Sequence, residues 1–166
     1  YLGHCDRIDV HWGGFSVVEA TLNLLNESLN FGEHFDRFCL LSGSDFPIRS
    51  LSDIEKHFNS KKEFMRIDRR LNNSDNNSHC KNVRNYNFMD SPFINKFQYE
   101  NRLFQKIPRK SYDKISLFHG CQWFSLTNKC VKHVMQFIKN NQDYVAFHKR
   151  TLCPDEIFFN SIVKNS

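Results

Sequence analysis

The sequence lacks any long hydrophobic run, any internal repeat and any segment that divides it. No apolar stretch reaches about 18 residues, and no charged segment followed by an apolar one stands at the start, so neither a membrane span nor a signal peptide is visible. No linker rich in glycine or proline interrupts the 166 residues, which contain 6 glycines and 4 prolines. A single domain, residues 1–166, is therefore expected.

Metal-binding spacings of cysteine are also missing. The 6 cysteines form no CxxC pair and no His/Cys pattern typical of zinc, so a structural metal site is not expected. An even number permits disulfides in an oxidising compartment, whereas Cys39 lies in an apolar run and fits equally well as a small buried hydrophobe. Sequons at Asn26, Asn72 and Asn76 are consistent with a secretory route, but a chain rich in asparagine also forms such triplets by chance.

The positive charge is not gathered in a block. The formal net charge is +5 and the pI is about 8.9, with Lys and Arg spread along the chain. A nucleic-acid partner is therefore not indicated. A diffuse positive surface suits a nucleotide diphosphate, a polyanionic glycan or an anionic membrane face.

Two capping boxes predict two helices. Ser16 and Glu19 stand three residues apart, and apolar residues then recur at helical spacing, which predicts a helix over residues 16–30. Ser52 and Glu55 repeat the signal and predict a second, shorter helix.

The other periodic segments complete an alternating pattern. "FDRFCLLSGSDFP" leads from an apolar strand into a turn, "EFMRID" alternates like a strand, and "ISLFHGCQWFSLT" contains two short apolar segments. Helices are predicted after Thr127 and from Pro154, with a loop over residues 144–153 between them. This order predicts an α/β sandwich with a mostly parallel central sheet.

Two stretches show no clear periodicity. Residues 71–87 are rich in Asn and Ser and are predicted to form a long surface loop, of the kind that serves as a lid or is disordered. Residues 86–109 mix aromatic and basic side chains, with a short helix expected near 95–105.

Candidate ligand contacts stand where predicted strands and helices meet. In open α/β sheets a ligand binds beyond the carboxyl ends of the strands, where glycine admits backbone amides and exposed tryptophan suits a sugar ring. The alternative is that these glycines form turns and these tryptophans fill the core. The candidates are Trp12, Gly13, Asp45, Gly120, Cys121 and Trp123.

A pair of carboxylates opens the last predicted helix. Pro154 is tolerated at a first helical position, and the acidic Asp155 and Glu156 suit the positive end of the helix dipole. Two carboxylates are more than a helix start needs, however. A carboxylate at the lip of a pocket can also take a proton from a substrate hydroxyl.

Four blocks of the sequence resemble the core-2/I-branching enzyme family, glycosyltransferase family 14, which includes β-1,6-N-acetylglucosaminyltransferases and peptide O-xylosyltransferases. The order of the blocks and the distances between them resemble those of the family, and together the blocks extend from residue 10 to residue 166. The blocks read "VHWGGFSVVEATLNLL", "FCLLSGSDFPIRS", "LFHGCQWFSLTNKCVKHV" and "TLCPDEIFFNSIVKNS".

The resemblance implies a GT-A-like, Rossmann-type fold, a UDP-sugar donor and inversion at the anomeric carbon. The family's catalytic base is a glutamate in the motif that reads Pro154-Asp155-Glu156 here, so this role carries over to Glu156. One carboxylate is enough for inversion, because the diphosphate leaves as a stable anion. Asp155 either orients this turn or contacts the substrate.

The resemblance also implies catalysis without a metal cofactor. Asp45 lies where many GT-A enzymes hold a metal-binding acidic pair, but its neighbours Ser44 and Phe46 leave no DxD motif. Family members balance the donor phosphates with basic side chains from later in the chain. Arg69 follows a predicted strand near the expected acceptor side and is a candidate sugar or peptide contact, unless it is an ordinary surface arginine.

The expected function is transfer of N-acetylglucosamine or xylose from a UDP-sugar to a glycan or peptide hydroxyl; the alternative is a non-catalytic glycan-binding domain of the same fold. Family members carry further strands before the first block and a basic segment after the last, so the chain is expected to be part of a larger catalytic domain, incomplete at both ends. Membrane association would use a segment outside it. The expected location is the lumenal side of the Golgi membrane if the protein is eukaryotic, or the cytoplasm or inner-membrane periphery if it is bacterial.

Overall fold

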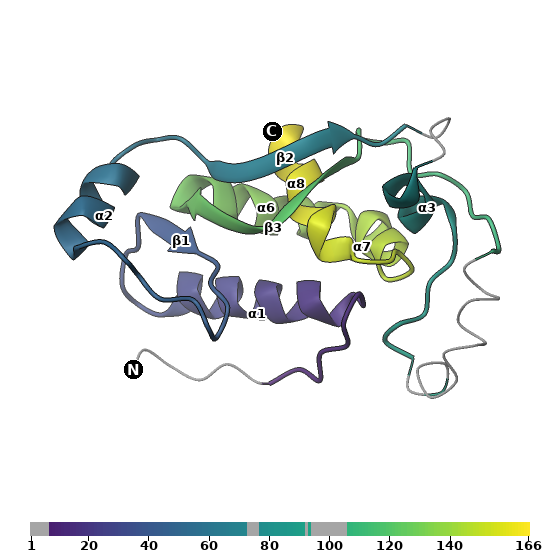
Figure 1. Cartoon of the computed structure of the whole chain (residues 1–166), viewed down its shortest axis with the longest axis horizontal. Coiled ribbons are helices and arrows are strands. Elements are labelled where there is room, and N and C mark those ends of the chain that lie inside the picture. The colour runs from purple at the N-terminus through teal and green to yellow at the C-terminus, as the bar shows by residue number, and fades with distance from the viewer. Residues whose placement is uncertain (1–6, 73–76, 92, 94–105) are drawn as a thin grey trace.

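The computed structural model describes residues 7–72, 77–91, 93 and 106–166, which contain a three-stranded sheet in the order β1-β3-β2 (Figure 1). The strands are β1 (Arg37–Cys39), β2 (Phe64–Arg70) and β3 (Phe118–Thr127). Strand β3 is the central one and runs antiparallel to both neighbours. The α/β class is therefore confirmed, whereas a mostly parallel sheet is not.

The insertion of β3 explains this difference. Strands β1 and β2 run in the same direction and are joined through helix α2 (Leu51–Phe58), as the alternating pattern predicts. They do not pair with each other, because β3 lies between them. Local periodicity indicates which segments are strands, but the neighbour of each strand depends on contacts between distant segments.

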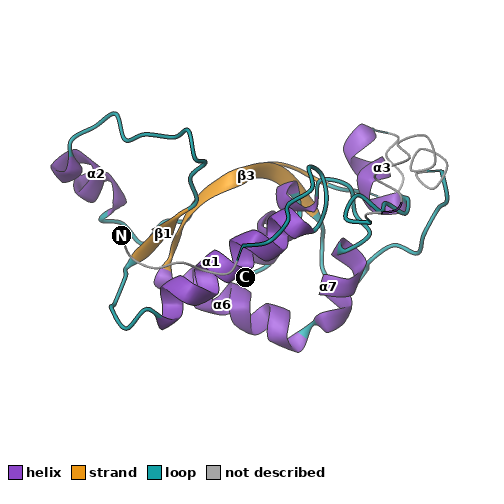
Figure 2. Ribbon diagram, turned by 90° about the horizontal axis from the view of Figure 1, so that it is seen from below, coloured by secondary structure: helices purple, strands orange, loops and turns teal. Residues whose placement is uncertain are grey.

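Helices cover the sheet and lie at its two ends. Helix α1 (Ser16–Asn30) and helix α6 (Asn128–Asn140) lie on one side of the curved strand β3 (Figure 2). Helix α2 and helix α3 (Ser78–Arg84) lie at opposite ends of the molecule in both views. Among the described residues, every helix is too short or too polar to traverse a lipid bilayer.

The centre of the core is formed by the C-terminal segment. The residues from Ile157 to Phe159 are almost fully buried, and helix α8 (Phe158–Lys164) packs against β3. Helix α7 (Gln142–His148) occupies part of the predicted 144–153 loop, and its buried Tyr144 hydroxyl donates to the Phe158 carbonyl at 2.9 Å. Burial of these large side chains is the main stabilising contribution, about 1.5–3 kcal/mol for each.

Helix α1 confirms its predicted range but not its predicted cap. Ser16 is the first helical residue, and Asp90 caps the helix from a distant segment. Its carboxylate accepts hydrogen bonds from the Phe15 amide at 2.5 Å and from the Ser16 hydroxyl at 2.6 Å. A Cβ at Gly14 would collide with this carboxylate, so glycine permits the close approach.

The 71–87 segment is more ordered than predicted. Helix α3 begins after Asn77, whose Oδ1 accepts a hydrogen bond from the Cys80 amide at 2.8 Å, and Cys80 and Val83 are buried. The surface-loop prediction is therefore wrong for residues 78–84, since Asn and Ser there serve as a cap and a helix start rather than as loop residues. Residues 73–76 and the helix expected near 95–105 lie outside the described residues.

No disulfide joins the cysteines of the described part of the chain. Cys39, Cys80, Cys121, Cys130 and Cys153 are all free thiols. Cys39 is exposed at the end of β1, so its interpretation as a small buried hydrophobe is wrong.

Candidate active site

The Glu156 carboxylate stands on a tight turn at the edge of the core. Pro154–Glu156 form the short 3₁₀ helix η1, preceded by Cys153 in a left-handed conformation with φ of 48°. The Cys153 amide donates to the Gly13 carbonyl at 2.9 Å, which ties the turn to the segment before α1. The Glu156 side chain remains 39% exposed, so solvent and ligands can reach its oxygens.

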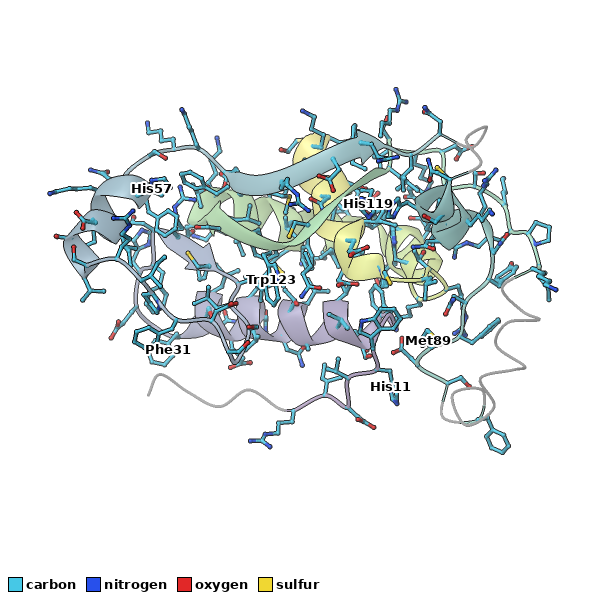
Figure 3. All side chains as sticks on the ribbon, viewed as in Figure 1. His11, Phe31, His57, Met89, His119 and Trp123 are labelled. Carbon is cyan, nitrogen blue, oxygen red and sulfur yellow. The ribbon has the colours of Figure 1, made fainter. Side chains whose placement is uncertain are left out.

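His119 faces this carboxylate from β3. Its Nε2 atom lies 3.2 Å from Oε2 of Glu156, and its side chain is only 9% exposed. Figure 3 labels His119 on this part of the sheet. On the other side of the ring, Nδ1 lies 3.6 Å from Oδ2 of Asp68 on β2. One imidazole therefore stands between two carboxylates contributed by different segments.

His79 on α3 is the fourth member of a group that also contains Glu156, His119 and Asp68. Its ring centroid lies 3.8 Å from that of His119. Desolvation by burial lowers the pKa of His79, and the nearby His119 and Arg69 lower it further. The His79 imidazole is therefore favoured in its neutral form at neutral pH.

Asn160 holds the Glu156 turn against the sheet. Its side-chain amide donates to the Cys121 carbonyl at 3.1 Å and to the Glu156 carbonyl at 3.0 Å. Gly120 allows this contact, because a Cβ there would collide with the Arg66 carbonyl and approach the Asn160 side chain. Gly120 and Cys121 thus lie beside the Glu156 turn, and Gly120 has a clear packing role.

The predicted Trp12-Gly13 segment lies next to the same turn. Gly13 has φ of 73°, and a Cβ added there would lie 3.2 Å from the Leu152 side chain, so this glycine favours both the backbone conformation and the close packing. Trp12 is 79% exposed, and Trp123 on β3 is 40% exposed. Neither indole is a core residue, and both are accessible to a ligand.

The remaining predicted residues differ in position. Arg69 pairs with His119 across β2 and β3, which places it beside the histidine group. Asp45 instead accepts a hydrogen bond from the Ser42 amide at 2.6 Å and thereby stabilises its own turn. Asp155 lies next to Glu156, and burial, together with the Glu156 charge, raises its pKa to about 6.

Three residues beside Glu156 or its histidine partner are not indicated as site residues by the sequence: Asp68, His79 and His119. His119 is visible directly before Gly120 in "LFHGCQW", but a single histidine in an apolar strand has no local signal that connects it to Glu156. His79 falls in the segment predicted as a loop. Only the pairing of β2 with β3 and the packing of α3 bring these side chains together.

The chemistry of the group is that of proton transfer. An accessible carboxylate with a fixed imidazole partner can accept a proton from a bound hydroxyl group. The fold and the site thus define an α/β protein. Its candidate base is a carboxylate on a short 3₁₀ helix beside the sheet.

A sequence model of the core-2/I-branching enzyme family matches residues 5–166, and the chain belongs to this family. Two curated proteins are similar to it. One is a xylosyltransferase of Ciona intestinalis, 25% identical over 175 residues, which cover 96% of this chain and 18% of that protein. The other is xylosyltransferase 1 of Rattus norvegicus, 24% identical over 165 residues, which cover 96% of this chain and 19% of that protein. The chain thus spans less than a fifth of the length of these relatives.

Proposed function

We propose that this chain carries the base of an inverting glycosyltransferase, with xylose or N-acetylglucosamine transferred from a UDP-sugar to a glycan or peptide hydroxyl. Glu156 takes the proton of the acceptor hydroxyl while that oxygen forms a bond to the anomeric carbon. The bond between this carbon and the UDP oxygen breaks on the opposite face, and UDP leaves with the electron pair. The family membership and the names of the two relatives support this reaction class.

The observation that carries the proposal is the placement of the Glu156 carboxylate. It is 39% exposed and lies 3.2 Å from Nε2 of His119. A helix-capping carboxylate would instead be directed at backbone amides, and Glu156 has no such contact with its own helix among the hydrogen bonds of the described residues. The carboxylate is therefore available to an acceptor.

The acceptor side is proposed to include the two accessible indoles. Trp12 and Trp123 come from segments that precede the Glu156 turn in the chain, and both present apolar ring surface to solvent. Aromatic rings of this kind pack against the apolar faces of sugar rings. A sugar acceptor is accordingly favoured over a small polar molecule.

The experiment is the substitution Glu156→Gln in the full-length protein. It keeps the size of the side chain but removes the base, so turnover should fall by roughly 100-fold or more with donor binding nearly unchanged. Glu33→Gln makes the same chemical change at an exposed position and serves as the control. Turnover of Glu156→Gln equal to that of the control would overturn the assignment.

A second candidate is a glycan-binding domain without turnover. The 79% exposure of Trp12 favours it, because a binding platform alone explains an indole in this position. The two candidates differ in one measurable product. Acceptor binding without UDP release from any UDP-sugar would favour the binding domain, whereas UDP release that depends on Glu156 would favour the enzyme.

A further inference from the structure

Three potential metal ligands meet at the Glu156 turn. His79 comes from α3, His119 from β3 and Glu156 from η1, and one ligand atom of each lies within 4.8 Å of the other two. We propose that these three side chains bind a Zn²⁺ ion and that the bound ion inhibits glycosyl transfer. The binding stands on geometry alone, whereas the inhibition rests on the proposed role of Glu156 as base.

The separations suit a single small ion. A tetrahedral Zn²⁺ with bonds of about 2.1 Å holds its ligand atoms about 3.4 Å apart. Nε2 of His119 and Oε2 of Glu156 are already 3.2 Å apart. The third ligand needs only a side-chain adjustment, because the ring of His79 already lies beside that of His119, with 3.8 Å between the ring centroids.

A carboxylate behind His119 supports the same interpretation. A metal-bound histidine usually donates its second ring N–H to a carboxylate, which fixes the ring orientation. Asp68 Oδ2 lies 3.6 Å from Nδ1 of His119, and this buried nitrogen has no hydrogen-bond partner among the described residues. Metal binding at Nε2 leaves the proton on Nδ1, where it faces Asp68.

The donor set favours Zn²⁺ over Mg²⁺. Two imidazoles and one carboxylate suit Zn²⁺, whereas Mg²⁺ prefers oxygen ligands alone. Three protein ligands leave a fourth position for water, which the accessible side of Glu156 admits. The positive charge of Arg69, which also lowers the pKa of His79, opposes binding of a cation. The charge of Arg66 is compensated by Asp68, because Nε of Arg66 lies 3.1 Å from Oδ1 of Asp68.

The ion acts on the reaction through one oxygen. The Glu156 lone pair that coordinates Zn²⁺ is not available to accept the acceptor proton, and the positive charge weakens the carboxylate as a base. Zn²⁺ is thus an inhibitor at the base and not a cofactor. Occupation of this site by Zn²⁺ therefore reduces turnover.

The test is a titration of the full-length protein with Zn²⁺ by calorimetry. Wild-type protein should bind one ion at this site, His79→Ala should weaken binding by at least about 10-fold, and Asp68→Asn should weaken it by about 10-fold as an outer partner. His133→Ala removes an exposed histidine of α6 and should leave the affinity unchanged. Circular dichroism checks that each variant is folded, and Mg²⁺ at equal concentration should not compete.

The outcomes separate binding from function. Equal Zn²⁺ affinity in wild type, His79→Ala and Glu156→Gln would overturn the site, whatever the role of Glu156 in transfer. If the site is correct, UDP release by wild type should fall as it fills with Zn²⁺, and His79→Ala should require at least about 10-fold more Zn²⁺ for the same inhibition. If Zn²⁺ binding depends on His79 but saturating Zn²⁺ leaves UDP release unchanged, the proposed inhibition is overturned and the role of Glu156 as base is contradicted.

Discussion

Nε2 of His119 lies 3.2 Å from Oε2 of Glu156, although the two residues are 37 positions apart in the sequence. His119 is nearly buried within the central strand, whereas the Glu156 carboxylate remains partly exposed. The rigid sheet therefore supplies a fixed polar partner to a side chain that a ligand can reach. This arrangement orients the carboxylate without burying it, which is the requirement for a base that acts on an incoming hydroxyl.

His119 is expected to position the base. His119→Leu removes the polar partner and should lower kcat by roughly 10- to 100-fold with a small change in KM, because the carboxylate loses its orientation. His119→Gln keeps an N–H group that can donate to Glu156 and should retain more activity. The measurement is steady-state UDP release, and equal losses in both variants would indicate a purely structural residue.

Asp90 is expected to stabilise the start of α1. Asp90→Ala removes the hydrogen bonds to the Phe15 amide and the Ser16 hydroxyl, so the free energy of unfolding should fall by about 1–2 kcal/mol. Urea denaturation measures this change. Asp9→Ala, at a side chain that is 96% exposed, is the control and should change it by less than about 0.5 kcal/mol. Equal effects of the two substitutions would contradict the capping role.

Gly120 is expected to be intolerant of a side chain. Gly120→Ala forces a methyl group against the Arg66 carbonyl, which should cost about 1–3 kcal/mol of unfolding free energy. Gly43→Ala is the matched control, because a Cβ added at Gly43 would meet no heavy atom within 4 Å. A melting temperature unchanged by Gly120→Ala would contradict the close contact between β2 and β3.

Asp155 is expected to make stability depend on pH. Burial raises its pKa from 3.8 to about 6, so the folded state binds a proton more tightly than the unfolded state does. Its stabilising contribution is complete below about pH 4 and is lost as the pH rises through about 6. Asp155→Asn should therefore be more stable relative to wild type at about pH 7.5 than at about pH 4, as urea denaturation at both values would measure. A difference independent of pH would contradict the raised pKa.

Turnover is expected to proceed without a divalent metal. Asp45 is flanked by Ser44 and Phe46 and is bonded within its own turn, so it does not form an acidic pair for a donor-bound ion. EDTA should leave UDP release intact, and should increase it if traces of Zn²⁺ occupy the proposed inhibitory site. Complete loss of UDP release in EDTA, restored by Mn²⁺, would contradict metal-independent transfer.

The sequence predicts some helices and their caps better than others. The sequence predicts helix α1 over its full range, because apolar residues at helical spacing are a property of one contiguous segment. It does not predict the cap, because Asp90 is 74 positions away from Ser16. Similarly, the sequence predicts a loop where α3 forms. The apolar face of this short helix consists of Cys80 and Val83, and two residues are too few to show helical periodicity in the sequence.

The sequence by itself determined the family and the α/β class, and it made Glu156 the candidate base, since ordered motifs and local periodicity are contained in the order of residues. The tertiary structure alone decided that β3 enters between β1 and β2, that His119 lies beside this glutamate, and that Asp68 and His79 lie beside His119. The physical reason is that local backbone preferences act over a few residues, whereas strand pairing and side-chain packing join segments far apart in the chain.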